Sequence, residues 1–460
     1  MKTRFLALWD ALRSSLWFVP ALMAAAAIGL SFATVALDEA IKHKVLENVG
    51  WLWAGGPEGA RGLLSTVAGS MITVAGVVFS ITIVALSLAS SQFGPRLLRN
   101  FMRDTGNQVV LGTFIATFLY CLLVLRTVRG ADGSEFVPYV SITVALALAV
   151  ASLGVLIYFI HHASVSIQVS TVIEVVDREL DAAIDRLFPE ELGREVPEQQ
   201  QPEDKGEVPE GFEREVHPVA AITSGYLQAI DAGALMKVAT ERDLIFRVRH
   251  RPGRFVMPGG DLVLAWPGAR VDQALGEQIR AAFILGSERT LTQDVEFALN
   301  QLVEVAVRAL SPGMNDPFTA VSCVDRLGAA LCRLATRVLP APHRYDEDGN
   351  LRVIADVVTF AGAVDAAFTQ IRQYGRTSMA VTVRLLDTIG GIAAYTRREE
   401  DRAALLRQAV MIERGGRETL SDEWDREEVE KHFQAVVRML TQQKAVMPAL
   451  VADGRHQRIS

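Results

Sequence analysis

Five polar residues in two short stretches carry side chains that can bind a ligand or stabilise a fold. Glu288, Arg289 and Asp294 lie in GSERTLTQDVEFALNQL, and Asn315 and Asp316 lie in RALSPGMNDPFTAV. Carboxylates beside a guanidinium can hold a polar ligand or form a buried ion pair. Asn or Asp before Pro is also typical of a helix start, where the side chain caps the first turn. We interpret the five as a ligand-binding or structural polar cluster, which is a site only if its members converge in space.

Hydroxyl and small side chains recur along the uncharged stretch of residues 62–95. One series, with a spacing of seven residues, is Thr66, Thr73, Ser80 and Ser87. A second series, three positions later, is Gly69, Gly76, Ile83 and Ser90. Seven residues are close to two helical turns, so both series lie along one side of a helix. Hydroxyl oxygens on such a face can contact hydrated ions, which makes it a candidate pore lining.

Other residues near this stretch fit the pore hypothesis. Val77, Phe79 or Val84 can supply an apolar constriction, and Arg96 and Arg99 would place positive charge at the cytosolic mouth and favour anions. The alternative is helix packing, because Gly, Ser and Thr let membrane helices approach closely and hydroxyls can bond to their own backbone. The sequence leaves both interpretations open.

The sequence contains no familiar catalytic or metal-binding motif. It has no P-loop, dinucleotide-binding glycine motif, HExxH or nucleophile elbow. His161 and His162 point about 100° apart on a helix and form no shared chelate, although a pH-sensing role stays open. Cys121, Cys323 and Cys332 are too few and too scattered for a disulfide framework or a zinc site. We therefore expect no metal, no cofactor and no enzymatic activity.

Four uncharged segments are long enough to cross a bilayer, which takes about 20 helical residues. They are residues 16–37, 62–95, 105–125 and 136–160. A charge at the centre of such a helix costs about 2.5–3.5 kcal/mol, so its absence from all four segments is informative. The sequence predicts a four-helix transmembrane domain over residues 1–160, with both termini on one side of the membrane.

The remaining 300 residues are charged and amphipathic. A helical period continues the fourth span as a cytosolic helix over residues 161–188, and an acidic, proline-rich linker covers residues 189–216. β-prone runs between Pro-Gly turns predict a small β-barrel-like sheet over residues 217–268. A helical bundle follows over residues 269–445, and a disordered tail over residues 446–460. The predicted fold is thus a membrane α-helical domain with a cytosolic α+β domain.

Charge and cysteine content limit the possible partners of the protein and its cellular compartment. The linker holds ten acidic and three basic residues, and 3 − 10 = −7 equals the net charge of the chain, so the rest is nearly neutral. It therefore lacks the broad basic surface that nucleic-acid binding needs, and the expected partner is the lipid bilayer. Free cysteines fit a reducing cytosol, which places both termini there.

Several motifs occur in a consistent order along nearly the whole chain. They are the Ser/Thr-rich second span ending SSQFGPRLL, then SGYLQAID, RPGRFV, GSERT and SPGMNDPFTA. Together with the four N-terminal spans, they resemble bacterial membrane proteins of the domain of unknown function 2254 family. The resemblance implies a multi-pass protein of the bacterial inner membrane with a cytosolic C-terminal domain. It implies no established activity and no catalytic residues.

Two functions from different classes fit these observations. The first is a homo-oligomeric channel or transport protein, in which second spans from several copies surround a pathway for small ions that the cytosolic domain regulates. The alternative is a membrane-anchored sensor or scaffold whose cytosolic domain binds a ligand or a protein. A continuous axial opening in the oligomer would favour the first.

Overall fold

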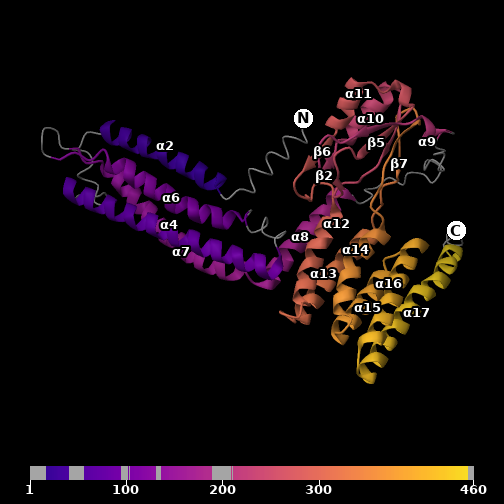
Figure 1. Ribbon diagram of the computed structural model, residues 1–460. Coiled ribbons are helices and arrows are strands. Elements are labelled where there is room, and N and C mark those ends of the chain that lie inside the picture. Colours follow the sequence, from indigo (N-terminus) through magenta and orange to yellow (C-terminus); the bar gives the residue numbers. More distant parts are fainter. Residues whose placement is uncertain are drawn as a thin grey trace, which may run out of the picture. The chain divides into compact units, whose positions relative to one another are not determined.

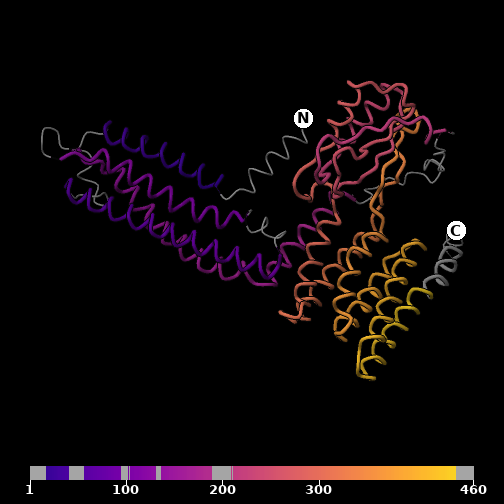
Figure 2. The backbone as a smooth tube through the Cα atoms, in the orientation of Figure 1, coloured from indigo at the N-terminus to yellow at the C-terminus, as the bar shows by residue number. Residues whose placement is uncertain are grey.

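The computed structural model describes residues 17–40, 56–94, 102, 104–130, 136–188, 209 and 211–453, with side chains described up to residue 441. The chain divides into two compact units, Met1–Val172 and Ile173–Ser460 (Figures 1 and 2). Arg96, Arg99 and most of the predicted linker over residues 189–216 lie outside the described residues.

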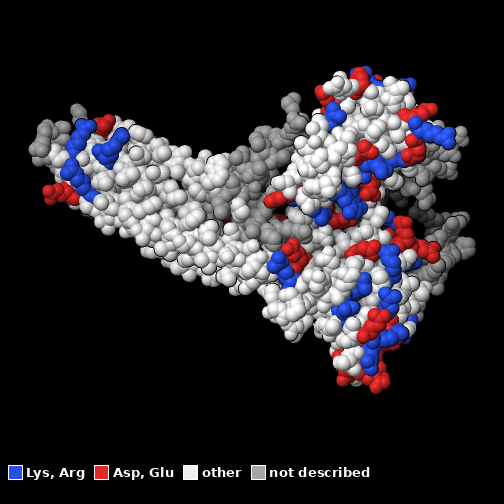
Figure 3. Space-filling view, viewed as in Figure 1, with Lys and Arg blue, Asp and Glu red and all other residues white. Residues whose placement is uncertain are grey.

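The first unit contains four helices that are long and apolar enough to cross a membrane. They are α2 (Phe18–Ala40), α4 (Pro57–Phe93), α6 (Thr105–Leu125) and α7 (Tyr139–Ser166). Figure 3 shows mostly uncharged side chains along this unit, with Lys, Arg, Asp and Glu gathered at one end. This distribution suits hydrocarbon, where an unpaired charge is costly. The four-span prediction is confirmed.

α6 is the central helix of the first unit, which we call the membrane unit. It packs against α2, α4 and α7, and its side chains Phe114, Tyr120 and Cys121 are fully buried. α4 is the least covered of the four helices. Of its most apolar 18 consecutive residues, 11% are buried within the chain, against 44% for α6. Most of the α4 surface is therefore available to lipid or to another molecule.

The fourth span does not continue as one helix. α7 ends at Ser166, and after two residues the chain begins α8 (Val169–Leu187). The buried side chains of α8 follow a helical period and include Val172, Val176, Leu180 and Ile184. Within the predicted continuation over residues 161–188, residues 161–166 thus belong to α7, and a separate amphipathic helix covers most of the rest.

The β-rich part of the second unit forms two sheets, with strand orders β1-β5-β3-β8-β7 and β4-β2-β6. The strands are β1 (His217–Ala220), β2 (Gly225–Ile230), β3 (Ile245–Val248), β4 (Phe255–Val256), β5 (Asp261–Trp266), β6 (Phe283–Gly286), β7 (His343–Tyr345) and β8 (Leu351–Ile354). The barrel-like prediction is not confirmed: among the described strands both sheets stay open. The first ends at β1 and β7, and the short strands of the second do not join it.

Short helices accompany these sheets, and distant sequence completes one of them. The helices are α9 (Phe212–Glu215), α10 (Ala232–Glu241), the 3-10 helix η3 (Gly268–Arg270) and α11 (Gln273–Ala281). Leu227, Phe246, Val263 and Ile279 lie in the shared core. β8 pairs parallel to β3, with Phe246 opposite Val353. The sheet that we predicted over residues 217–268 therefore also includes β7 and β8, from residues 343–354.

The helical part consists of three hairpins that stack in a row (Figure 1). They are α12 (Val295–Ala309) with α13 (Pro317–Ala335), α14 (Phe360–Gly375) with α15 (Met379–Ala393), and α16 (Glu399–Thr419) with α17 (Glu423–Asp453). α12 packs on α14 and α14 on α16, while α13 packs on α15 and α15 on α17. The predicted helical bundle is a two-layered array of this kind, and such arrays present long surfaces.

Within each layer the helices run in the same direction. Asp325 of α13 pairs with Arg384 of α15, and Gly328, three residues later, lies against Thr388. Asp387 of α15 pairs with His432 of α17, and Gly390 lies against Val436, so residue numbers rise together along this layer. The turns at residues 310–316, 376–378 and 420–422 therefore share one edge of the array, as Figure 1 shows. We call this edge the turn edge.

The end of the chain differs in part from the prediction. A disordered tail was expected over residues 446–460, but α17 continues to Asp453. The sequence AVMPALVAD supplies mostly helix-compatible residues despite its proline. Residues 454–460 lie outside the described residues.

Candidate functional site

The hydroxyl series of α4 faces away from the core of its own chain. Thr66, Thr73, Ser80 and Ser87 are all exposed. The buried side chains of α4 are Ala60, Leu64, Ala68, Ala75, Val78, Ala89 and Phe93. In the second series, Gly69, Gly76 and Ile83 are exposed and Ser90 is half-buried. A Cβ atom placed at Gly69 or Gly76 would meet no atom within 4 Å. Both series therefore form one outer face, which we call the α4 stripe.

The hydroxyl groups of the α4 stripe bond to their own helix. Thr66, Thr73 and Ser80 each donate to the carbonyl four residues earlier, at 2.7, 2.8 and 2.9 Å. These bonds satisfy the donor of each hydroxyl in an apolar medium. Each oxygen keeps acceptor lone pairs on the outer face. The geometry is thus compatible both with close packing and with contact to water or ions.

Apolar side chains flank the stripe. Val77, Phe79 and Val84 are 54%, 50% and 58% exposed in the single chain. Val77 is four residues from Thr73, and Val84 is four residues from Ser80, so both lie one helical turn from a hydroxyl of the stripe. The positive mouth that we predicted from Arg96 and Arg99 falls outside the described residues and stays a prediction.

The start of α12 brings Arg289 and Asp294 together. Asp294 Oδ1 accepts the backbone N–H of Phe297 at 3.1 Å and so caps the helix. Its Oδ2 lies 2.8 Å from both Nε and Nη2 of Arg289. Burial raises the pKa of the Asp294 carboxyl, and the Arg289 guanidinium opposes that rise. The pair is a buried ion pair combined with a helix cap.

The RPGRFV motif packs against the same point. Arg251 Nη2 donates to Glu296 Oε1 at 2.6 Å. Gly253 has φ +92°, and a Cβ atom there would lie 2.1 Å from Asp294 Oδ2. Only glycine suits both the backbone angle and this approach. We call Arg251, Gly253, Arg289, Asp294 and Glu296 the α12 cluster.

Two further motifs reach the α12 cluster through amide side chains. Gln293 accepts the backbone N–H of Ile230 at 2.9 Å and donates to its carbonyl at 3.1 Å, which ties SGYLQAID to the start of α12. Gln228 donates to the backbone carbonyl of Glu288 at 2.9 Å. In the α12 cluster, two guanidiniums pair with two carboxylates. The arrangement joins the β-rich part to the helical array, and it favours the structural interpretation of Arg289 and Asp294.

Asn315 and Asp316 lie at the other end of α12. This helix has 15 residues and is about 22 Å long at 1.5 Å per residue. Asp316 caps α13 by accepting from the Thr319 N–H at 3.1 Å, and the Thr319 hydroxyl lowers the pKa of this carboxyl. Asn315 has φ +48°, a conformation that Asn tolerates. The structure therefore does not bring the five predicted polar residues into one site.

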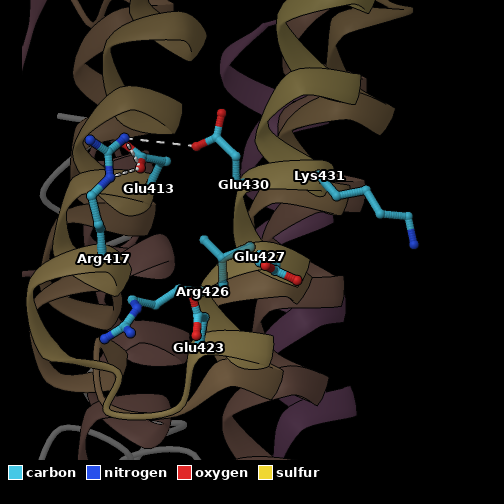
Figure 4. Close-up of a pocket in the computed structure, with 8 residues that line it drawn as sticks. Glu413, Arg417, Glu423, Arg426, Glu427, Glu430 and Lys431 are labelled. Carbon is cyan, nitrogen blue, oxygen red and sulfur yellow. Dashed lines mark hydrogen bonds and ion pairs between the residues drawn. The ribbon is translucent and has the colours of Figure 1, made fainter.

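A cavity of about 450 Å³ lies between α16 and α17 (Figure 4). Its lining is Glu413, Arg417, Glu423, Arg426, Glu427, Val429, Glu430 and Lys431. Arg417 bonds to Glu413 and lies 3.7 Å from Glu430, so charges of the lining pair with one another. None of the residues singled out from the sequence lines this cavity. Among the described residues, no group of three His, Cys, Asp or Glu side chains is placed to hold a metal ion.

Two polar contacts in the membrane unit were missed in the sequence. Asp38, which is buried, accepts the backbone N–H groups of Val140 and Ser141, both at 2.9 Å, and so caps α7 from the end of α2. Asp104 caps α6 and lies 2.6 Å from His162 Nε2. Both aspartates are the first acid beside an uncharged span, which was the available signal. Their partners lie about 100 and 58 positions away, which the sequence did not indicate.

Comparison with known proteins agrees with this architecture. Residues 13–390 match the model of a family described as predicted membrane protein (DUF2254). The uncharacterised proteins Rv1290c of Mycobacterium tuberculosis and Mb1321c of Mycobacterium bovis are each 36% identical to this chain over 434 residues. The matched region covers 93% of this chain and 81% of each relative. No solved structure matched. The chain therefore belongs to the DUF2254 family of predicted membrane proteins.

Proposed function

We propose that this protein is an oligomeric channel or transport protein in which α4 helices from several copies face one another along a pathway for small ions. One observation carries the proposal: the α4 stripe, which is small and hydroxyl-bearing, faces outward and is not used by the core of its own chain. Small residues let membrane helices approach closely, so this face suits another α4 better than it suits lipid alone.

The chemistry of the stripe supports an ion pathway. The hydroxyl donors of Thr66, Thr73 and Ser80 are occupied by helix carbonyls, so oxygen lone pairs point outward where hydrated ions can use them. Val77 and Val84, one turn from the hydroxyls, supply the apolar constriction in this proposal. We place the protein in the bacterial inner membrane with both termini cytosolic, so that the second unit regulates the pathway from the cytosol.

Matched glycine substitutions test this proposal. Gly76 of α4 and Gly154 of α7 both have open space where a Cβ atom would be, so the two positions are matched in the room that they offer to a first side-chain atom. Gly76→Leu adds bulk to the α4 stripe, whereas Gly154→Leu adds the same bulk to another exposed membrane face. We expect Gly76→Leu to reduce ion flux into liposomes and to weaken the oligomer, and Gly154→Leu to resemble wild type in both. Equal behaviour of the two variants would contradict the proposal.

A second candidate is a membrane-anchored sensor or scaffold. The three stacked hairpins support it, because helical arrays of this kind form extended binding surfaces. An intact oligomer in liposomes that conducts no ion under any tested condition would favour this candidate. We propose no enzymatic activity, since the residues of the predicted ligand-binding or structural polar cluster lie at the two ends of α12 and do not converge.

A further inference from the structure

α8 lies parallel to α13 in a register fixed by ion pairs. Asp177 pairs with Arg326 at 3.0 Å, Asp181 with Arg333 at 2.6 Å, and Asp185 also with Arg333 at 2.8 Å. Residue numbers rise together along both helices, so the N-terminal ends of α8 and α13 point the same way. Eight residues before the first pair, the register brings Phe318 to the level of Val169. The turn edge of the array is therefore the edge at which α8 begins.

The beginning of α8 is tethered closely to the membrane. Only Ile167 and Gln168 separate it from α7, which has 28 residues and is about 42 Å long, against about 30 Å for the hydrocarbon core. After the α6–α7 connection, the first Asp, Glu, Lys or Arg is Glu174, so the first turn of α8 is uncharged. This composition suits the headgroup region of a bilayer.

Exposed apolar side chains occupy the turn edge beside the start of α8. Phe318, in the first turn of α13, is 83% exposed, and Met314, in the preceding turn, is 44% exposed. Tyr374, at the end of α14 on the same edge, is also exposed. Transfer of aromatic and long apolar side chains from bulk water to a membrane interface is favourable.

Acidic side chains are concentrated at the other end of the turn edge, around the α16–α17 turn. Asp422, Glu423 and Asp425 surround the start of α17, and Figure 3 shows acidic side chains gathered there. The α12–α13 turn holds one acid, Asp316, whose half-buried carboxylate accepts from the backbone N–H and the hydroxyl of Thr319. A cytosolic leaflet with anionic lipids attracts cations and repels such acids. The turn edge therefore presents two exposed apolar side chains and one hydrogen-bonded acid at the α12–α13 turn, and three acids two hairpins away.

We infer that Met314 and Phe318 form an interfacial anchor, which inserts into the headgroup region of the bilayer that α7 crosses. The occupant of this exposed apolar surface is a phospholipid bilayer. The contact fixes the orientation of the helical array on the membrane surface. It does not depend on whether α4 lines an ion pathway.

Site-specific fluorescence in vesicles tests the anchor. The full-length protein with Cys332→Ser keeps only the two fully buried cysteines, Cys121 and Cys323, which do not label. An environment-sensitive fluorophore is attached to Phe318→Cys or, in a second variant, Met314→Cys, and the protein is reconstituted in phosphatidylcholine–phosphatidylglycerol vesicles. Two controls use other exposed aromatic positions: Trp424→Cys at the acidic end of the turn edge, and Tyr395→Cys at the opposite edge, after α15.

We expect the probes at positions 318 and 314 to show blue-shifted emission, strong quenching by nitroxide-labelled lipid and weak quenching by iodide. The probes at positions 395 and 424 should show the reverse. Equal quenching by lipid at positions 318 and 395 would overturn the inference. Protection of position 318 from both quenchers would also overturn it, because a protein surface rather than lipid would then cover the anchor.

Discussion

Single aspartates hold the ends of the membrane helices in place. A helix start leaves backbone N–H groups without intrahelical partners, and in a membrane no water replaces them. Asp38 supplies three acceptor contacts to the start of α7: to the N–H groups of Val140 and Ser141 and to the Ser141 hydroxyl, the last at 2.7 Å. Because Asp38 belongs to α2, this cap also joins two helices that are separated by about 100 residues.

Replacing Asp38 therefore tests the inter-helix cap. Asp38→Asn removes the negative charge and turns one acceptor into a donor that faces backbone N–H groups. We expect a loss of about 1–3 kcal/mol in the free energy of unfolding, measured by thermal or denaturant unfolding in detergent. Glu39→Gln is the control, because Glu39 is the exposed neighbour on the same turn. The account of the cap fails if both variants unfold like wild type.

A second aspartate sets a pH dependence in the second unit. Asp346, in the turn between β7 and β8, accepts from Arg352 Nε at 2.6 Å, and this bond lowers its pKa from 3.8 to about 2. A lowered pKa means that the ionised carboxylate stabilises the folded state above pH 3.8. This contribution is lost as the pH falls from about 4 towards 2.

Denaturant midpoints at pH 4.5 and pH 2.5 measure this effect. We expect the midpoint to fall less between these pH values in Asp346→Asn than in wild type, because the variant has already lost the titrating group. Asp348→Asn, in the same turn, should keep the slope of the wild type. If the midpoint of Asp346→Asn falls between pH 4.5 and pH 2.5 as much as that of the wild type, ionisation of this carboxylate does not contribute to folding stability.

At the scale of elements, the joint between the β-rich part and the helical array depends on one close approach. Gly253 and Gly349 both have positive φ, +92° and +80°, so alanine at either position costs about 1–2 kcal/mol in backbone strain. Only Gly253 also lies against the Asp294 carboxylate, whereas Gly349 has open space around it. Gly253→Ala should therefore destabilise the protein by about 1–3 kcal/mol more than Gly349→Ala. Equal unfolding midpoints for the two variants would contradict this packing account.

The sequence was a good guide where local chemistry decides the element. The helix start predicted at Asp316 is that of α13, because an Asp cap and a following Pro act within one turn. Asp294 caps α12, a role that the sequence analysis did not assign to it. Elsewhere tertiary pairing decided: residues 283–286, which lie in the region predicted as a helical bundle, form β6 because they pair with β2. Likewise, β8 joins β3 across about 100 residues, a partner that no local pattern specifies.

At the scale of the whole molecule, the sequence identified the residues of the α4 stripe but not what it faces. Its period of seven follows from helix geometry, so the structure places the series on one side of α4 as predicted. Convergence of the soluble polar residues was not predictable, because Asp294 and Asp316 are close in sequence yet separated by the length of α12. Whether α4 meets water or lipid depends on further copies of the chain, which one sequence does not describe.

Accessibility of the α4 stripe is the most direct test of the ion-pathway proposal. Thr73→Cys and Ser80→Cys, each in full-length protein with Cys332→Ser and reconstituted in liposomes, are treated with a charged, membrane-impermeant thiol reagent. Ile157→Cys on α7 is the control, because Ile157 is an exposed side chain on another membrane helix. The account predicts that the two α4 positions react while position 157 does not. If positions 73 and 80 stay as unreactive as position 157 in both conducting and resting conditions, the stripe faces packed helices or lipid and the pathway does not run along α4.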